Sequence, residues 1–510
     1  MLRPGRDDYS GTSLVLATIE RSGLMGITRK QIASLTGLGE SRVGVMLDQL
    51  STTGSIAQVG RSLWISRTHA DLSTPDSERG SSAWFRKEFE KEYALRIGTY
   101  GVDVQFRSND RLPVHRWWPY VQGFSAGFAT EALQRYGIGK GSVVLDPFCG
   151  SGTVPVVART FGAQGIGIDL LPVAAFVSNA KGRWETRPER LRAAAERVVG
   201  DRRPSDLPRP FLRKTGNQFS PGILESLLRI KENIWAEPAG PVRDLLKLAF
   251  AGILIESSHL KRSPCLGYAK KGTIPPELPY RLLPEAVERM CADLRTLQSQ
   301  RARWGPPLRI VQGNSGQVPL EEESVDLVVT SPPYVNGMDY PTNYKVEMAW
   351  LDMIDSYSSL RDLRSSMVAC DNIPKSVVAD GGHDPRVDSD EWVGLVRKGI
   401  CRNIQRKAAY RRLDMADIVG KYFRDLVPVL ENVYRSLKPG APFLVVNGDS
   451  LMAGTYVPGD AIFVRLAAKV GFEVEALDIA RTRRSGQRRS FLLRESVAVL
   501  RKPRNAHPTG

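Results

Sequence analysis

Two glycines and two acidic residues have a spacing that suits a nucleoside cofactor. The apolar run 143–145 ends in Asp146, and Gly150 and Gly152 follow just before an apolar helical pattern. Glycines in such a turn permit positive φ angles and let a ligand approach the backbone closely. A helix that starts behind them offers free N–H groups and the positive end of its dipole. About seventeen residues after Gly152, Asp169 ends a second apolar run, where an acid can accept from two ribose hydroxyls.

A second motif, Ser331-Pro332-Pro333-Tyr334, directly follows the mostly apolar run 325–330 and can bind an exocyclic amine. The lone pair of such an amine is delocalised into its base, so a site must accept the N–H bonds and turn the lone pair toward an electrophile. The Ser331 hydroxyl and the Pro332 carbonyl can accept these bonds, and neither proline adds a competing N–H donor. Tyr334 offers a ring on which an extruded base can stack, a contact worth ~1–3 kcal/mol.

Together the two motifs resemble those of the S-adenosylmethionine-dependent amino-methyltransferases of DNA. The cofactor loop of that family has the form D-P-F-x-G-S-G-T, which residues 146–153 match, and its catalytic loop can read S-P-P-Y. The resemblance covers about residues 114–503. It implies an α/β fold of the class I methyltransferase (Rossmann-like) type, with a doubly wound sheet, and S-adenosyl-L-methionine as cofactor. A nicotinamide fingerprint would instead have a glycine directly after the strand and a third glycine later.

The resemblance also implies roles for single residues. Asp146 would meet the methionine ammonium, Phe148 a face of the cofactor, and Asp169 the ribose. The further expected cofactor-binding residues are Phe124, Gly150, Gly152, Thr153 and Asn314. Asn314 departs from the family, which commonly has an Asp that accepts from the adenine amine, although an Asn can still accept through its carbonyl.

The expected reaction is site-specific methylation of an exocyclic amino group on a flipped DNA base. Serine at the first position of the catalytic loop resembles the cytosine-N4 group, whereas an acid there is typical of adenine-N6 enzymes, so we expect cytosine N4. Adenine N6, an RNA base amine and a non-catalytic DNA-binding regulator remain as alternatives. The pair Pro264-Cys265 does not indicate cytosine-C5 chemistry, because no Glu-Asn-Val strand end accompanies it.

Composition limits the remaining choices. The 510 residues are too many for one core, and a formal charge of +16 favours a polyanionic partner, for which DNA is the leading candidate. Five cysteines without a C-x-x-C pair indicate neither a disulfide framework nor a zinc site. No leader and no apolar run near eighteen residues is evident. We therefore expect a cytoplasmic protein without metal or membrane contact, and leave open a restriction or defence protein as a further partner.

The first 67 residues predict a winged helix-turn-helix domain. Three helical patterns, the second capped by Thr28, precede two short strands at 56–59 and 62–65. The third helix would present Ser41, Arg42 and Gln49 to a major groove, with Arg42 as the expected contact. Winged helices also dock proteins, so both functions stay open.

The rest of the chain divides by composition. The expected parts are a linker (68–82), a first methyltransferase part (83–185), a mainly helical insertion for target recognition (186–305), a second methyltransferase part (306–503) and a tail (504–510).

Two basic segments predict contacts with DNA phosphates. The segment 397–424 contains only Asp414 and Asp417 as acids, and the segment 481–489 has five arginines and no acid, which we expect between the two strands of a closing hairpin. The candidates are Arg406, Lys407, Arg411, Arg412, Arg483, Arg484 and Arg488.

Overall fold

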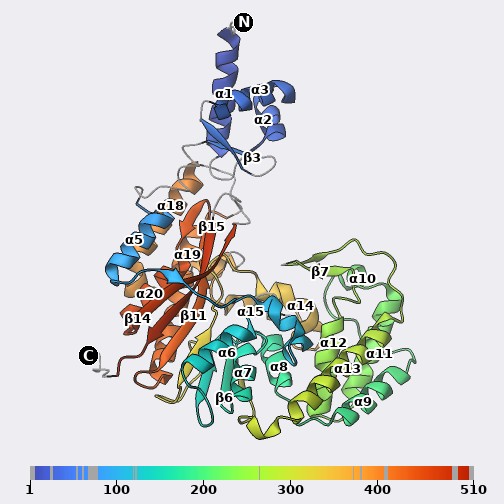
Figure 1. The fold of residues 1–510 in the computed structure, drawn as a ribbon. Coiled ribbons are helices and arrows are strands. Elements are labelled where there is room, and N and C mark those ends of the chain that lie inside the picture. The colour runs from blue at the N-terminus through green and yellow to red at the C-terminus, as the bar shows by residue number, and fades with distance from the viewer. Residues whose placement is uncertain are drawn as a thin grey trace.

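The computed structural model describes residues 6–22, 27–52, 55–59, 63–66, 79–118, 120, 123–263, 265–370, 373–379, 382–406, 412–484 and 492–504. Within these residues, Figure 1 shows a small N-terminal module, a central sheet with its helices, and a helical lobe beside the sheet. No helix in this part of the chain is long and apolar enough to cross a membrane.

An open sheet forms the centre of the molecule. Its eight strands are, in spatial order, β4 (Gly98–Thr99), β14 (Glu473–Arg484), β15 (Leu492–Arg501), β11 (Pro442–Gly448), β10 (Leu327–Thr330), β5 (Val143–Asp146), β6 (Gln164–Asp169) and β9 (Arg309–Gln312). The run from β11 to β9 is parallel, whereas β15 is antiparallel to β11 and β14. β6 and β9 follow β5 on one side of the sheet, whereas β10, the next strand in the chain, pairs with β5 on the other side. The loops after β5 and β10 therefore meet at this reversal of strand order, where open α/β sheets bind ligands.

Helices cover both faces of this sheet. Val329 of β10 packs in a core with α6 (Ala126–Arg135) and α7 (Thr153–Thr160), whereas its neighbour Val328 packs in a core with α19 (Met415–Ser436) and α20 (Gly459–Val470). Every residue of β10 and β11 is buried. Because both faces of these strands are buried, their sequences are mostly apolar and do not alternate between apolar and polar residues.

A helical lobe lies between β6 and β9 in the chain. After α8 (Pro172–Lys181) it comprises α9 (Pro188–Gly200), α10 (Thr215–Gln218), α11 (Pro221–Ala236), α12 (Pro241–Ile253) and α13 (Leu278–Gln298). Its apolar side chains share one core with α8 and α14 (Tyr340–Trp350). A short antiparallel hairpin of β7 (Leu260–Arg262) and β8 (Leu266–Tyr268) interrupts the helices, a feature that the helical periodicity of the segment does not predict.

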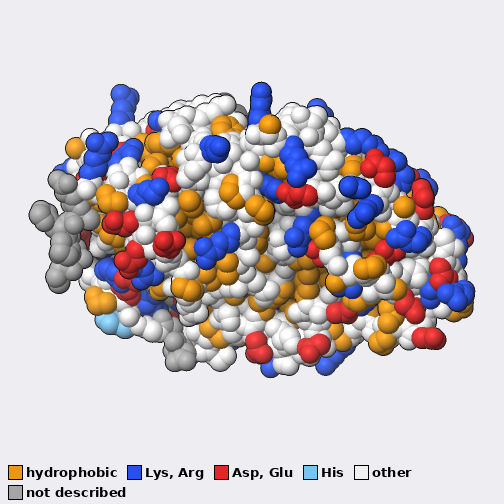
Figure 2. Space-filling view, turned by 90° about the horizontal axis from the view of Figure 1, so that it is seen from below, with side chains coloured by type: hydrophobic (Ala, Val, Ile, Leu, Met, Phe, Trp, Pro, Cys, Tyr) orange, Lys and Arg blue, Asp and Glu red, His pale blue; other side chains and the backbone are white. Residues whose placement is uncertain are grey.

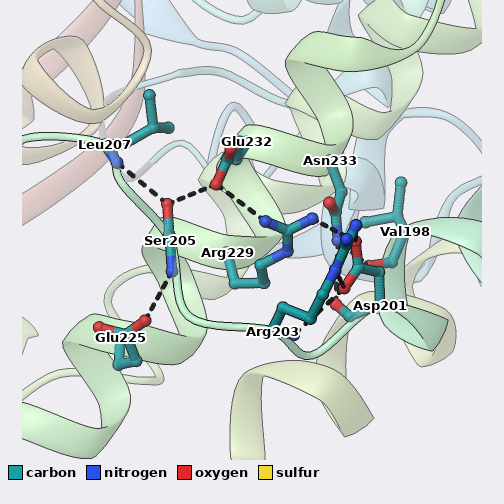
Figure 3. A network of polar contacts seen from close by, with 9 residues as sticks. All are labelled: Val198, Asp201, Arg203, Ser205, Leu207, Glu225, Arg229, Glu232 and Asn233. Carbon is teal, nitrogen blue, oxygen red and sulfur yellow. Dashed lines mark hydrogen bonds and ion pairs between the residues drawn. The ribbon is translucent and has the colours of Figure 1, made fainter.

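Polar contacts hold the loop after α9 in place (Figure 3). Arg229 of α11 binds the Asp201 carboxylate and donates to Glu232 Oε2 at 3.0 Å. Glu232 in turn accepts from Ser205 Oγ at 2.7 Å. Since Arg229 and Glu232 belong to one helix, these bonds fix the loop 201–207 across α11.

The N-terminal module has three helices and a small antiparallel sheet. Its elements are α1 (Arg6–Ser22), β1 (Ile27–Thr28), α2 (Arg29–Thr36), α3 (Glu40–Thr52), β2 (Ile56–Val59) and β3 (Leu63–Ser66), with the strand order β1-β3-β2. Thr28 caps α2, because its Oγ1 accepts from the Gln31 N–H at 3.2 Å. Val15, Ile19 and Ile32 lie in the module's own core, and Figure 1 shows the module apart from the sheet.

Shorter elements complete the described chain. Ahead of α6 come α5 (Ser82–Glu92), η3 (Phe106–Arg111) and η4 (His115–Trp117), and η5 (Arg301–Arg303) precedes β9. The helices α15 (Tyr357–Ser365), α16 (Lys375–Ala379), α17 (Pro385–Asp388) and α18 (Glu391–Arg406) lie between α14 and α19. The hairpin β12 (Ser450–Met452) and β13 (Thr455–Val457) follows β11.

One expectation about the C-terminal hairpin is wrong. Arg481, Arg483 and Arg484 do not lie in a loop between short strands but within β14, a strand of 12 residues. The strand continues through them because β15 pairs with it along the same length, with Arg481 opposite Glu495 and Arg484 opposite Leu492. Backbone pairing with β15 thus extends the strand past the expected turn.

Candidate active site

The loop after β5 is shaped by its glycines. Gly150 and Gly152 have φ angles of 50° and 81°, in the left-handed region that favours glycine. A Cβ on Gly150 would lie 2.8 Å from the Tyr120 ring, and a Cβ on Gly152 would lie 2.9 Å from Ser178 Oγ. Both positions therefore require glycine for space as well as for conformation.

Two carboxyl groups flank this loop. Asp146 is buried and accepts from Thr330 Oγ1 at 2.6 Å and from the Phe148 N–H at 3.0 Å. Asp169 accepts from the N–H groups of Gly150 and Leu171, both at 2.9 Å. Removal from water raises the pKa of Asp146 to about 7 and that of Asp169 to about 6, although the hydrogen bonds act in the opposite direction.

A cavity at the switch point of the sheet joins both motifs. Among the residues predicted to bind a cofactor or substrate, those that line it are Phe124, Asp146, Phe148, Gly150, Thr153, Asp169, Asn314, Ser331 and Pro333. Asp146 and Asp169 are the only charged side chains among its described lining residues. The Ser151 hydroxyl, which also lines it, is buried without a hydrogen-bond partner in the described part of the protein.

Other predicted residues lie beside this cavity. Gly152 does not line the cavity but is the N-cap residue of α7. Pro332 is buried within the catalytic loop. Asn314 lines it and uses its Oδ1 to accept from the Gly316 N–H at 2.9 Å, which fixes the turn after β9. Among the described residues, no group of three or more His, Cys, Asp or Glu could hold a metal ion.

Hydrogen bonds with α19 and β15 fix the catalytic loop. Tyr422 of α19 donates to the Pro333 carbonyl at 2.8 Å. Tyr334 donates to Glu495 Oε1 of β15 at 2.5 Å, and Glu495 also binds the Arg481 guanidinium. Burial and the neighbouring Glu495 raise the pKa of Tyr334 well above its usual value. The tyrosine is therefore a neutral hydrogen-bond donor with a fixed ring.

An aromatic stack that the motifs do not include adjoins the cavity. Tyr120, which lines the cavity, stacks on Tyr344 of α14 with ring centroids 5.4 Å apart and an interplanar angle of 7°. The Arg262 guanidinium lies over the Tyr344 ring, 4.4 Å from its centroid. Tyr120, Arg262 and Tyr344 come from three distant segments of the chain and meet only in the fold.

Further cavity residues come from parts of the chain without a motif. They are Gly123, Cys149, Leu170, Leu171, Ser315, Tyr340, Ser366, Met367 and Val368. Residues 366–368 follow α15 and line the cavity from a segment that contains neither motif. Burial raises the pKa of the Cys149 thiol, so Cys149 is a packing residue of the cavity wall.

The residues predicted to bind DNA lie on different elements and differ in exposure and in their partners. Arg42 on α3, Arg406 at the end of α18 and Arg484 on β14 are exposed. Arg483 donates to the Asp449 carbonyl at 3.2 Å. Arg412, predicted to contact phosphate, is a poor candidate for it, because its side chain is 10% exposed and binds Asp414. Lys407, Arg411 and Arg488 lie outside the described residues.

This open α/β sheet, with its ligand cavity after β5 and with β15 antiparallel near one end, is the class I fold of S-adenosylmethionine-dependent methyltransferases. No family model matches the chain. The chain is similar to Type II methyltransferase M.BsoBI of Geobacillus stearothermophilus, at 24% identity over 453 residues that cover 78% of this chain and 88% of that relative. Type II methyltransferase M.AvaI of Nostoc sp. is 24% identical over 441 residues, which cover 78% and 89%.

A solved structure gives weaker similarity. A SAM-dependent methyltransferase from Methanosarcina mazei aligns with 73% of this chain and 97% of its own length, at 11% identity and a TM-score of 0.26.

Proposed function

We propose that the chain is a site-specific DNA methyltransferase that transfers a methyl group from S-adenosyl-L-methionine to an exocyclic amine of a flipped base, namely N4 of cytosine. One observation carries the proposal: Ser331 and Pro333 of the catalytic loop line the same cavity as Asp146 and Asp169 of the cofactor half. The Ser331 hydroxyl, an acceptor for an amine, thus shares one space with two carboxyl groups suited to a cationic cofactor.

The cavity fits this cofactor. S-adenosyl-L-methionine brings an ammonium, a sulfonium and two ribose hydroxyls, and the cavity offers two carboxyl groups without a basic side chain among its described lining residues. Asp146 would hold the ammonium and Asp169 the ribose hydroxyls. The unpartnered Ser151 hydroxyl is a further group that a polar ligand would satisfy. When bound, the cofactor supplies an electrophilic methyl group.

The catalytic loop prepares the amine. The Ser331 hydroxyl and the Pro332 carbonyl accept its two N–H bonds, which leaves the nitrogen lone pair directed toward the cofactor side of the cavity. Tyr334 stacks on the extruded base, while its hydroxyl stays bound to Glu495. Tyr422 keeps the loop in this position through the Pro333 carbonyl.

DNA is the proposed substrate, in a restriction-modification setting. The similarity to two type II methyltransferases supports it, as does the net charge of +16. The serine of the catalytic loop favours cytosine over adenine by family resemblance. We further propose that the N-terminal module is a winged helix-turn-helix domain that contacts DNA through Arg42, and that the lobe 186–305 takes part in target recognition.

The test is methyl transfer from S-adenosyl-L-methionine labelled in its methyl group. Label should enter double-stranded DNA and not structured RNA, and Ser331→Ala should lower kcat by roughly 100-fold, since one transition-state contact is lost. Lys140→Ala, an exposed residue ahead of β5, serves as the control and should leave kcat unchanged. Label in RNA alone, or full activity of Ser331→Ala, would contradict the proposal.

A further inference from the structure

The hairpin β7–β8 carries a basic segment in the helical lobe. Residues 259–273 include Lys261, Arg262, Lys270 and Lys271 and contain no acidic residue. On the face seen from below in Figure 2, Lys and Arg side chains are interspersed with Asp and Glu. The segment 259–273, like 481–489, instead carries charge of one sign, which favours an anionic partner.

Buried contacts fix this hairpin on α14. Arg262 donates to the Asn343 carbonyl at 2.9 Å and to Glu347 Oε1 at 2.7 Å, and the exposed fractions of the Arg262 and Glu347 side chains are 11% and 1%. The Leu266 N–H donates to Asn343 Oδ1 at 2.7 Å. A buried ion pair tolerates little movement, because separating its charges would leave a buried carboxylate without a partner. The hairpin thus has one position relative to α14.

That position is beside the catalytic loop. At the tip of the hairpin, Cys265 Sγ lies 3.3 Å from Met338 Sδ, and Met338 comes four residues after Tyr334. The Gly337 N–H donates to the Tyr334 carbonyl at 2.7 Å, so the segment between them is a tight turn. Figure 1 shows the hairpin at the top of the helical lobe, with its tip directed toward the middle of the molecule.

Three side chains of the segment are available to a partner. Lys261 and Lys270 are exposed and form no ion pair with an acid among the described residues, and the Tyr268 ring is 50% exposed. Lys271 differs, because its ammonium donates to the carbonyls of Ile255 and Ser258. Lys261, Tyr268 and Lys270 are called the hairpin set below.

We propose that the hairpin set contacts the DNA strand next to the flipped base, with Lys261 and Lys270 on phosphates and Tyr268 packed against a sugar or base. A base that reaches Ser331 must leave the helix, so the phosphates on either side of it lie over the loop 331–338. An element that touches Met338 meets these phosphates. This inference rests on the proposed function. It adds that the hairpin β7–β8 is the element of the lobe that meets the substrate.

The experiment uses the full chain with the double variant Lys261→Ala/Lys270→Ala. The slope of log affinity for DNA against log salt should become less steep by about two, because two phosphate contacts are lost. S-adenosyl-L-methionine affinity should not change. The matched control is Lys87→Ala/Lys140→Ala, which removes the same charge from exposed positions on α5 and ahead of β5 and should keep the slope.

Tyr268 gives an independent readout. Tyr268→Ala should weaken DNA binding by about tenfold, whereas Tyr268→Phe, which keeps the ring, should bind as the parent chain does. If the parent chain binds and methylates DNA but the double variant has the same slope as the control, the inference is overturned and the proposed function stands. If the parent chain neither binds nor methylates DNA, both are overturned.

Discussion

Replacement of Asp169 tests the proposed contact with the ribose. Asp169→Asn keeps an acceptor oxygen for one of the two N–H donors, Gly150 and Leu171, but removes the charge that we propose for the ribose hydroxyls. We expect cofactor affinity to fall by about 1.5–3 kcal/mol, or ten- to a hundredfold, as measured by titration calorimetry. A folded variant with unchanged affinity would remove Asp169 from the site.

The pKa values of the two cavity carboxyl groups predict opposite pH effects on binding and on stability. A cationic cofactor needs ionised carboxylates, so its affinity should rise as pH increases through about 6 and about 7, the pKa values of Asp169 and Asp146. Below pH 6 we expect a loss of about tenfold per pH unit for each group that must ionise.

The ligand-free protein should respond in the other direction. Both folded pKa values lie above the usual value of about 4, so the folded state binds more protons than the unfolded state between these limits. The stabilising contribution of both groups is full below about pH 4 and is lost as pH rises through 6 and 7. Urea unfolding at pH 5 and pH 8 gives the change in the free energy of unfolding between the two pH values. This change should be smaller for Asp169→Asn than for the parent chain. An equal pH dependence of both proteins would contradict the assigned shift.

At the scale of elements, the catalytic loop depends on helix α19 and strand β15. Tyr422→Phe removes only the hydroxyl that donates to the Pro333 carbonyl. Since one neutral hydrogen bond contributes about 0.5–1.5 kcal/mol, kcat should fall by roughly two- to twelvefold while cofactor affinity stays constant.

Tyr434→Phe, on the same helix, is the control for this change. A Tyr422→Phe enzyme with the kcat of the Tyr434→Phe enzyme would show that the bond does not position the loop. A loss of cofactor affinity would instead mean that α19 supports the whole cavity.

The sequence predicts those parts of the site that lie next to one another in the chain. The loop 146–153 and the loop 331–334 each follow an apolar strand, and local spacing suffices to recognise them. The stack of Tyr120, Tyr344 and Arg262 joins three distant segments, so no local pattern contains it.

Charge patterns are harder to interpret from sequence, because their partners are not local. The segment 481–489 contains no acid, yet its first residue, Arg481, binds Glu495 across the β14–β15 pair. Arg424, within a basic segment, donates to Asp388 Oδ1 of α17 at 2.6 Å. Composition therefore overestimates the number of basic side chains that remain for DNA.

At the scale of the whole molecule, the N-terminal module has its own core and stands apart in Figure 1. Deleting residues 1–75 should leave cofactor affinity unchanged and weaken DNA binding, because the proposed contact through Arg42 is lost. Calorimetry and DNA titration measure the two effects. Loss of both affinities would indicate a structural role for the module, and unchanged DNA affinity would favour a protein-docking role.

The identity of the methylated base tests the central claim most directly. DNA incubated with the protein and S-adenosyl-L-methionine is digested to nucleosides, which are separated and identified by mass spectrometry. The shared cavity and Ser331 predict N4-methylcytosine as the product. N6-methyladenine as the sole product would contradict the assignment of the base, and 5-methylcytosine or unmodified DNA would contradict the amine mechanism itself.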